Sequence, residues 1–357
     1  MAAASVDNSA IETAPPAPQS SQTADSPALS VQSLRVTFGT NQGTLTAVED
    51  IGVNIAPGKT LALVGESGSG KSVTSLAIIR LLAGRGRIAE GSIALRGKDG
   101  AVKDLAQMAE PELEAIRGND LGMVFQEPMT SLNPVLTVGE QIAEPIRIHM
   151  GLSRSDAMLR AIDMLDRVGI PAPAARARQY PHEFSGGMRQ RVTIAIALAC
   201  DPVLLLADEP TTALDVTVQM QILNLLRKLQ AEQGMAMLFV THNLGVVAEI
   251  AHDVAVMYAG QIVEQGSVRE VLKSPRHPYT RGLLACVPQL GSASALKNSG
   301  RQLFSIPGMV PSLRDMPKGC RFAARCPHAQ PKCTVDTPEP VLTDTGNRVR
   351  CIRWNEI

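Results

Sequence analysis

A glycine-rich stretch beginning at residue 65 carries the residues best suited to bind phosphate. It follows an apolar run over residues 61–64 and reads Gly65-Glu66-Ser67-Gly68-Ser69-Gly70-Lys71-Ser72. Glycines let successive backbone N–H groups curl around a polyanion without Cβ collisions, and a helix that starts there presents its positive end. In this complete pattern Lys71 would reach the outer phosphates and Ser72 would offer its hydroxyl to Mg²⁺. The stretch predicts a nucleotide site rather than a simple glycine turn.

A pair of adjacent carboxylates indicates what is done with the nucleotide. An apolar run over residues 203–206 ends in Ala207-Asp208-Glu209-Pro210, which is typical of a buried parallel strand that delivers acids at its C-terminal edge. We expect Asp208 to hold the Mg²⁺ shell, directly or through water, and Glu209 to polarise an attacking water. The simpler alternative is a pair that caps the next helix.

A third motif lies between these two, at Phe184-Ser185-Gly186-Gly187-Met188, ahead of an apolar helical pattern over residues 192–199. Ser185 is a good helix N-cap, and the two glycines allow an anion to approach the exposed N–H groups. A second phosphate-binding helix start is therefore predicted. The sequence resembles the signature motif of ABC transporter ATPases, with the flanking residues altered to Phe184 and Met188.

The resemblance covers about 250 residues and includes four more positions in the order that the family requires. It implies that Gln126 senses Mg²⁺ and water and touches a membrane partner, and that Asp215 lies in a loop that crosses to a facing subunit. It also implies that His242 contacts the terminal phosphate and that Phe38 stacks on adenine. Each residue taken alone is more often structural, and their ordered spacing favours the functional interpretation.

The family resemblance implies a fold and an assembly. The fold class is α/β: a P-loop NTPase of ABC type, with a RecA-like parallel sheet core, an antiparallel β subdomain and a helical subdomain. Two such domains bind ATP head to tail, so the phosphate loop of one faces the signature of the other. Since no internal repeat is found, a second ATPase chain would have to complete the site.

The elements that position these motifs can be read from hydrophobic patterning. Short alternation near residues 31–38 and β-formers over residues 47–55 predict the antiparallel subdomain. From about Leu136 to Tyr180 helical spacing dominates, and one apolar stripe contains Ala161, Ile162, Leu165 and Val168. This region is expected to dock on a permease, although a core-facing helix explains the stripe equally well.

Composition limits the partners. The chain has 357 residues, 45% of them apolar, and no run approaches the roughly 20 apolar residues that span a bilayer. Lys plus Arg and Asp plus Glu number 34 each, so no global basic field attracts nucleic acid. Residues 1–29 are rich in Ala, Ser and Pro and are predicted to be a disordered tail rather than a secretory signal. The ATPase is assigned to residues 30–283 and a C-terminal extension to residues 284–357.

The extension narrows the resemblance to one group. Pro275-Arg276-His277-Pro278-Tyr279-Thr280 precedes a Pro-rich tail, and residues 127–134 and 208–215 are also similar to dipeptide and oligopeptide permease ATPases. The resemblance implies the ATP-binding subunit of a bacterial dipeptide or oligopeptide importer at the cytoplasmic face of the inner membrane. Its partners would be two permease subunits, a paralogous ATPase and an extracytoplasmic peptide-binding protein, with no nucleic acid. The alternative is a soluble ABC-type ATPase acting on nucleic acid or ribosomes.

Cysteine usage adds a further hypothesis. Cys200 and Cys286 adjoin apolar segments and are predicted to be buried. The extension carries Cys320, Cys326, Cys333 and Cys351. A disulfide is disfavoured in reducing cytoplasm, and the intervals are longer than those of usual zinc ligands. A structural [4Fe–4S] cluster needs four thiolates, and the resemblance includes chains with such a cluster. Zinc or no metal stays open.

Overall fold

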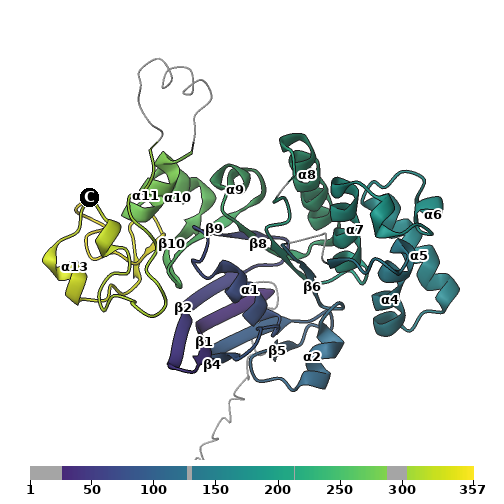
Figure 1. The fold of residues 1–357 in the computed structure, drawn as a ribbon, viewed down its shortest axis with the longest axis horizontal. Helices are drawn as coiled ribbons and strands as arrows, with labels where there is room; N and C mark the ends of the chain where they lie inside the picture. Colours follow the sequence, from purple (N-terminus) through teal and green to yellow (C-terminus); the bar gives the residue numbers. More distant parts are fainter. Residues whose placement is uncertain (1–25, 127–130, 213, 288–303) are drawn as a thin grey trace, which may run out of the picture.

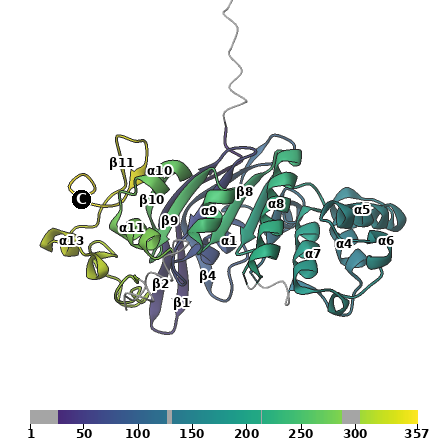
Figure 2. The same ribbon diagram turned by 90° about the horizontal axis from the view of Figure 1, so that it is seen from above.

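The computed structural model describes residues 26–126, 131–212, 214–287 and 304–357. Two β-sheets form its centre, with a group of helices at one end and the C-terminal extension at the other (Figure 1). The two ends lie on opposite sides of the sheets in the second view as well (Figure 2). Residues 1–25 of the tail predicted over residues 1–29 lie outside the described residues.

The larger sheet supplies the strands on which the phosphate and acid motifs depend. Its strand order is β11-β12-β10-β9-β3-β8-β7-β6, and the five strands from β9 to β6 pair in parallel. The bounds are β3 Thr60–Val64, β6 Leu121–Val124, β7 Leu204–Asp208, β8 Ala236–Thr241, β9 Asp253–Tyr258, β10 Gln261–Ser267, β11 Val341–Leu342 and β12 Arg348–Val349. Because parallel strands end at a common edge, the residues after β3, β7 and β8 meet there.

The smaller sheet is antiparallel, as the sequence pattern predicts. Its order is β2-β1-β4-β5, with β1 Leu29–Thr40, β2 Gly43–Ile55, β4 Gly86–Arg96 and β5 Val102–Asp104. Leu29 is fully buried and pairs with Ile55 on one side and Leu95 on the other. Strand β1 therefore begins one residue inside the tail assigned from sequence, because burial of this leucine in the sheet stabilises the strand.

Helices cover the parallel sheet and build the separate helical end. Those following the sheet strands are α1 Lys71–Ile78, α2 Glu110–Ile116, α8 Val216–Gln233, α9 Leu244–Ile250 and α10 Val268–Lys273. The helical end contains α4 Val138–Met150, α5 Arg154–Arg167, α6 Pro173–Arg176 and α7 Gly186–Leu198. Within α5 and just after it, Ala161, Leu165 and Val168 are fully buried. The apolar stripe therefore packs into the core of this end, and Ile162 is half-buried beside it.

The C-terminal extension is integrated with the ATPase sheet. Helix α11 spans Pro278–Ala285 and crosses the boundary assigned at residues 283 and 284. Strand β12 pairs with β10, with Glu264 opposite Val349, and therefore covers a sheet edge whose backbone groups would otherwise lack partners. The extension also contains the short helix α13, Pro331–Val335. The pairing of β12 with β10 was not predicted from the sequence, because the Pro-rich composition of the extension gave no strand pattern there.

Two further findings concern burial. Cys200 is buried as predicted, whereas Cys286 is only half-buried at the end of α11, so the prediction for Cys286 is wrong. In the part of the chain that the structure describes, none of the helices combines the length and the apolar character needed to cross a bilayer.

Candidate nucleotide site

The phosphate loop joins the end of β3 to the start of α1. Helix α1 begins at Lys71, and the residue before it, Gly70, is the N-cap. The φ of Gly70 is 103°, in the left-handed region that favours glycine. A Cβ on Gly65 would lie 2.1 Å from the carbonyl oxygen of Met257, and one on Gly70 would lie 2.7 Å from Cε of the same residue. Only glycine fits at these two positions. The loop therefore has the backbone curvature that a phosphate chain requires.

Lys71 is held inside this loop. Its side chain is 5% exposed, and its ammonium group donates to the carbonyl oxygens of Gly65 at 2.9 Å and Glu66 at 3.1 Å. Burial lowers the pKa of Lys71, and the charges of Glu209, Asp208 and Glu66 oppose this effect. The positive charge is thus held inside the loop that a polyphosphate would occupy.

Two oxygen ligands from different elements meet beside the loop. The hydroxyl of Ser72, in α1, donates to Oδ1 of Asp208, at the end of β7, over 3.2 Å. Asp208 is buried, and burial raises the pKa of its carboxyl group although the Ser72 hydrogen bond opposes this. A hydroxyl and a carboxylate in contact next to a phosphate loop are a donor set that suits Mg²⁺.

Glu209 is the meeting point of three side chains. Its Oε1 lies 3.2 Å from Nδ1 of His242, and its Oε2 accepts from Gln126 at 3.4 Å and from Thr212 at 2.8 Å. Burial would raise the pKa of Glu209, but the hydrogen bonds from His242 and Thr212 outweigh it and the pKa lies below its ordinary value. The carboxylate is therefore charged at neutral pH, as a general base must be.

The backbone at Glu209 is also unusual. Its φ is 47°, a left-handed conformation that non-glycine residues rarely adopt, and its N–H donates to the carbonyl oxygen of Val240 in the neighbouring strand, 3.0 Å away. A strained residue that is held by a strand–strand hydrogen bond is common at functional sites. The left-handed residue directly follows Asp208, the last residue of β7.

The signature residues lie on another part of the molecule. Ser185 caps α7 by accepting from the N–H of Met188 at 3.4 Å, and it is exposed together with Gly186. Asp215 caps α8 in the same way, accepting from the N–H of Val218 at 2.9 Å. Helix α7 lies beside α4 and α5, whereas α1 lies against the antiparallel sheet (Figure 1). Both motifs therefore have a local structural role and an exposed surface.

Phe38 is placed near the end of β1. The ring is half-buried, and a Cβ added to Gly86 in the paired strand β4 would lie 2.7 Å from its Cε1. The ring therefore packs on β4 and leaves part of its surface accessible, and its stacking on adenine stays a prediction. Residues 127–130 and Ala213, which belong to the motifs quoted above, lie outside the described residues.

The four cysteines of the extension converge without forming a metal site. Cys320, Cys326, Cys333 and Cys351 line one cavity of about 20 Å³. Burial raises the pKa of the Cys320 thiol to about 11. Nevertheless, within the described ranges no group of three or more His, Cys, Asp or Glu side chains is placed to hold a metal ion. The geometry therefore does not support the predicted cluster, although it does gather the thiols.

Sequence reasoning missed three residues that contact the site. Thr212 donates to Oε2 of Glu209. Because Thr212 is only three positions after Glu209 in the sequence, this contact could have been predicted from the sequence. Tyr279 accepts from the N–H of Glu66 at 2.9 Å, and Arg325 pairs with the Glu66 carboxylate. These two partners are 213 and 259 positions away from Glu66, and no local pattern connects them.

Comparison with known proteins agrees with this geometry. Residues 48–212 match the family model described as ABC transporter, and residues 263–333 match the oligopeptide/dipeptide transporter, C-terminal region. A protein of Brucella melitensis named as a peptide import ATP-binding protein is 60% identical over 332 residues, which are 93% of this chain and 98% of that protein. Another protein of this organism, also named as a peptide import ATP-binding protein, is 49% identical over 91% of this chain and 94% of its own length.

A solved structure provides the fold comparison. It is described as a dimeric, post-hydrolysis state of the ATP-binding cassette MJ0796 bound to ADP and Pi. The similarity has a TM-score of 0.59 at 29% identity and covers 68% of this chain and 99% of that one. Almost the whole of MJ0796 is matched, so MJ0796 is the shorter chain, and about a third of the present chain has no counterpart in it.

Proposed function

Because this chain belongs to the ABC transporter family of ATP-binding proteins, we propose that it is the ATP-hydrolysing motor subunit of an importer for dipeptides or oligopeptides. The observation that carries the hydrolytic part is the convergence of Gln126, Thr212 and His242 on Glu209, next to Asp208 and the phosphate loop. The peptide part is supported by the match to the oligopeptide/dipeptide C-terminal region and by the names of the Brucella relatives.

The binding half of the mechanism uses the phosphate loop. Backbone N–H groups of residues 65–72 would surround the phosphates, and Lys71 would exchange its loop carbonyl partners for phosphate oxygens. Ser72 and Asp208 would hold Mg²⁺, which neutralises developing charge on the phosphates when it is bound. The accessible part of the Phe38 ring would stack on the base.

The hydrolytic half uses the second cluster. Glu209 is charged and would take a proton from the attacking water. His242 and Gln126 hold the two carboxylate oxygens of Glu209 in place, and both are exposed enough to reach a terminal phosphate or a water. Positioning of Glu209 by two residues that follow β6 and β8 reduces the reorganisation needed at the reacting atoms.

Completion of the site requires a second chain in this proposal. Ser185, Gly186 and Gly187 are on α7, away from the phosphate loop of their own subunit, and the helix start is open to a partner. The facing subunit would be a paralogous ATPase. Nucleotide binding would draw the two subunits together and hydrolysis would release them, because the closed state alone contacts the terminal phosphate from both sides.

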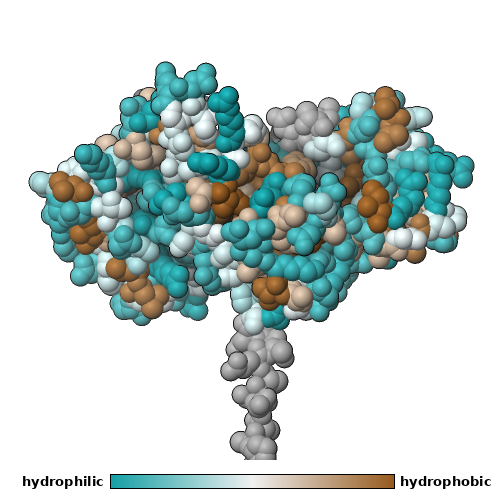
Figure 3. Space-filling view, turned by 90° about the horizontal axis from the view of Figure 1, so that it is seen from below, coloured by the Kyte–Doolittle hydropathy of each residue, from teal (hydrophilic) through white to brown (hydrophobic). Residues whose placement is uncertain are grey.

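The helical end offers a surface for membrane partners. Val135, Ile148 and Leu159 are 75%, 69% and 66% exposed there, and hydrophobic groups are visible at that end in Figure 3. We assign this surface to two permease subunits, with an extracytoplasmic peptide-binding protein delivering the cargo. The chain would then sit peripherally at the cytoplasmic face of the inner membrane.

The four-cysteine cavity is kept as a separate part of the proposal. We infer that an iron–sulfur cluster, if loaded during assembly, would be structural and would require the four thiols to close around it. Support comes from their convergence on one cavity, and the absence of a ligating arrangement among the described residues counts against it. No step of ATP hydrolysis depends on it.

The proposed function is tested by peptide uptake. The chain is coexpressed with candidate permease subunits and a candidate partner ATPase from the same organism and reconstituted into vesicles with a peptide-binding protein. We expect ATP-dependent accumulation of labelled dipeptide or tripeptide, and loss of uptake when Glu209 is changed to Gln. A protein that fractionates entirely away from membranes and together with RNA would instead indicate the soluble ATPase class.

A further inference from the structure

A residue of the phosphate loop carries a charge that ATP binding does not favour. Glu66 is the second residue of the loop, and its negative charge is close enough to raise the pKa of Lys71. A carboxylate at this place repels the phosphates that the loop must hold. Tight ATP binding therefore requires an interaction that neutralises the Glu66 carboxylate or directs it away from the phosphates.

The C-terminal extension supplies this interaction through Arg325. The guanidinium group of Arg325 donates to both carboxylate oxygens of Glu66, from Nη1 at 2.7 Å and from Nη2 at 3.1 Å. The Arg325 side chain is 6% exposed and the Glu66 side chain is 28% exposed. Bidentate pairs of this kind fix direction as well as charge.

Arg325 is itself held in place on several sides. Its Nε donates to the carbonyl oxygen of Pro307 at 2.9 Å, and its guanidinium carbon lies 5.7 Å from the ring centroid of Tyr258. The rings of Tyr258, Tyr279 and Phe322 form a cluster with centroids 4.6 to 5.4 Å apart. Tyr279 also accepts from the N–H of Glu66. The side chain and the backbone of Glu66 are therefore fixed by one preorganised group.

We propose that Arg325 is a positioning residue of the nucleotide site, an inference that rests on the proposed ATPase function. It neutralises Glu66 and, together with Tyr279, fixes the phosphate loop in its ATP-binding conformation. The C-terminal extension thereby becomes a condition for tight ATP binding by its own subunit, in addition to any role in contacts with partners.

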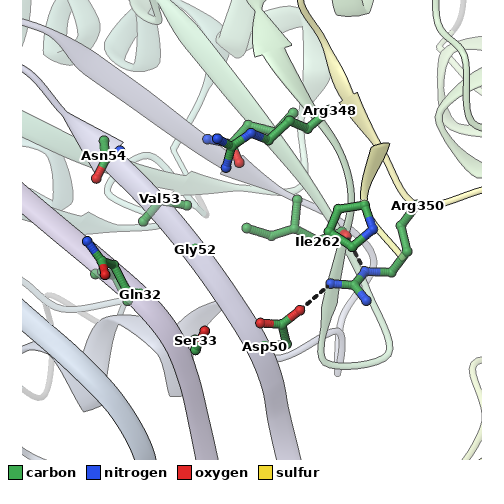
Figure 4. Close-up of a pocket in the computed structure, with 12 residues that line it drawn as sticks. Gln32, Ser33, Asp50, Gly52, Val53, Asn54, Ile262, Arg348 and Arg350 are labelled. Carbon is green, nitrogen blue, oxygen red and sulfur yellow. Dashed lines mark hydrogen bonds and ion pairs between the residues drawn. The ribbon is translucent and has the colours of Figure 1, made fainter. Parts of the chain in front are cut away.

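The same extension is attached to the ATPase at a second place, which provides a matched control. Arg350 donates to Asp50 of β2 at 2.7 Å, beside a cavity of about 550 Å³ (Figure 4). Its side chain is 5% exposed, so Arg350 is buried to nearly the same extent as Arg325 and also forms an ion pair across this boundary, through a single hydrogen bond to a more exposed carboxylate. Only the Arg325 pair touches the phosphate loop.

The test measures the Kd of MgATP on the full-length chain for wild type, R325Q, R350Q, E66Q and E66Q/R325Q. Removal of the compensating charge should weaken binding about tenfold in R325Q, and the defect should shrink at high salt because screening reduces the repulsion from Glu66. The double variant should recover to within about threefold of wild type, since the repelling carboxylate is gone. R350Q should stay within about twofold.

Several outcomes would overturn the inference. These are binding by R325Q within twofold of wild type, an equal defect in R350Q, or no recovery in the double variant. If R325Q does not fold, E66Q alone decides: unchanged or tighter binding supports the proposal, and weaker binding contradicts it. A wild-type chain that binds no MgATP would contradict the proposed function itself, which is a different result from each of these.

Discussion

Nδ1 of His242, which follows β8, lies 3.2 Å from Oε1 of Glu209, which follows β7. Two adjacent parallel strands thus bring a carboxylate and an imidazole together, although the two residues are 33 positions apart in sequence. Thr212 and Gln126 both donate hydrogen bonds to the other carboxylate oxygen, Oε2 of Glu209. The arrangement gives Glu209 a fixed direction and a depressed pKa before any water arrives.

Changing Glu209 to Gln should preserve ATP binding and remove most turnover, because the variant keeps the shape and lacks the base. We expect a loss of about 10²- to 10⁴-fold in phosphate release. The matched control is E249Q, at an exposed position of α9. Hydrolysis by E209Q at a near-normal rate would reassign the general base.

Changing Lys71 to Ala should impair nucleotide binding itself. The loss of charge-assisted hydrogen bonds is expected to weaken MgATP binding by at least about tenfold. Isothermal titration of the full-length chain measures this, with K228A on an exposed face of α8 as the control. An unchanged Kd for K71A would mean that the lysine serves only to brace the loop.

Subunit association should control turnover, because the signature residues of one chain lie away from its own phosphate loop. We expect E209Q with ATP to associate with its partner ATPase, and the wild-type rate per chain to rise with partner concentration. Sedimentation and phosphate release measure the two effects. A lone subunit that hydrolyses at the full rate contradicts a site shared between chains.

Iron analysis tests the cysteine hypothesis. If the proposed cluster is loaded, protein purified without oxygen contains about four irons per chain and loses them when Cys326 is changed to Ser, since a [4Fe–4S] cluster needs four thiolates. C286S is the control outside the cavity. Colourless, iron-free protein with titratable thiols at all four positions would rule out the cluster.

Acidification should destabilise the chain through His277. Burial lowers the pKa of His277 to about 3, whereas the unfolded chain keeps the ordinary 6.5, so the unfolded state binds more protons between these values. The contribution of His277 is complete above pH 6.5 and decreases on acidification towards pH 3, by at most about 1.4 kcal/mol per unit.

Urea unfolding at several pH values between 7.5 and 5 measures this effect. The H277N variant should show a flatter pH dependence than wild type, and H182N, at an exposed position, should not. The pKa of the buried neighbour Glu264 is raised by burial, so Glu264 acts in the opposite direction, and the comparison at fixed Glu264 isolates the histidine. Parallel curves for wild type and H277N would contradict the assignment.

The sequence by itself determined the local parts of this protein. The strand and glycine loop before Lys71, the acidic pair after β7 and the cap at Ser185 all depend on residues within a few positions of one another. Backbone geometry and apolar periodicity express such local requirements directly, so the motifs and the antiparallel subdomain could be predicted. The similarity of the whole motif order then predicted the ABC-type fold that the comparisons show.

Only the tertiary structure decided which distant groups meet. Arg325 and Glu66 are 259 positions apart, and nothing local distinguishes this pair within a chain that contains 34 basic and 34 acidic residues. The pairing of β12 with β10 and the burial of Leu29 likewise depend on strand order. Such contacts form when the folded sheet brings separate segments together, because the free energy of a single ion pair is too small to select its own partner.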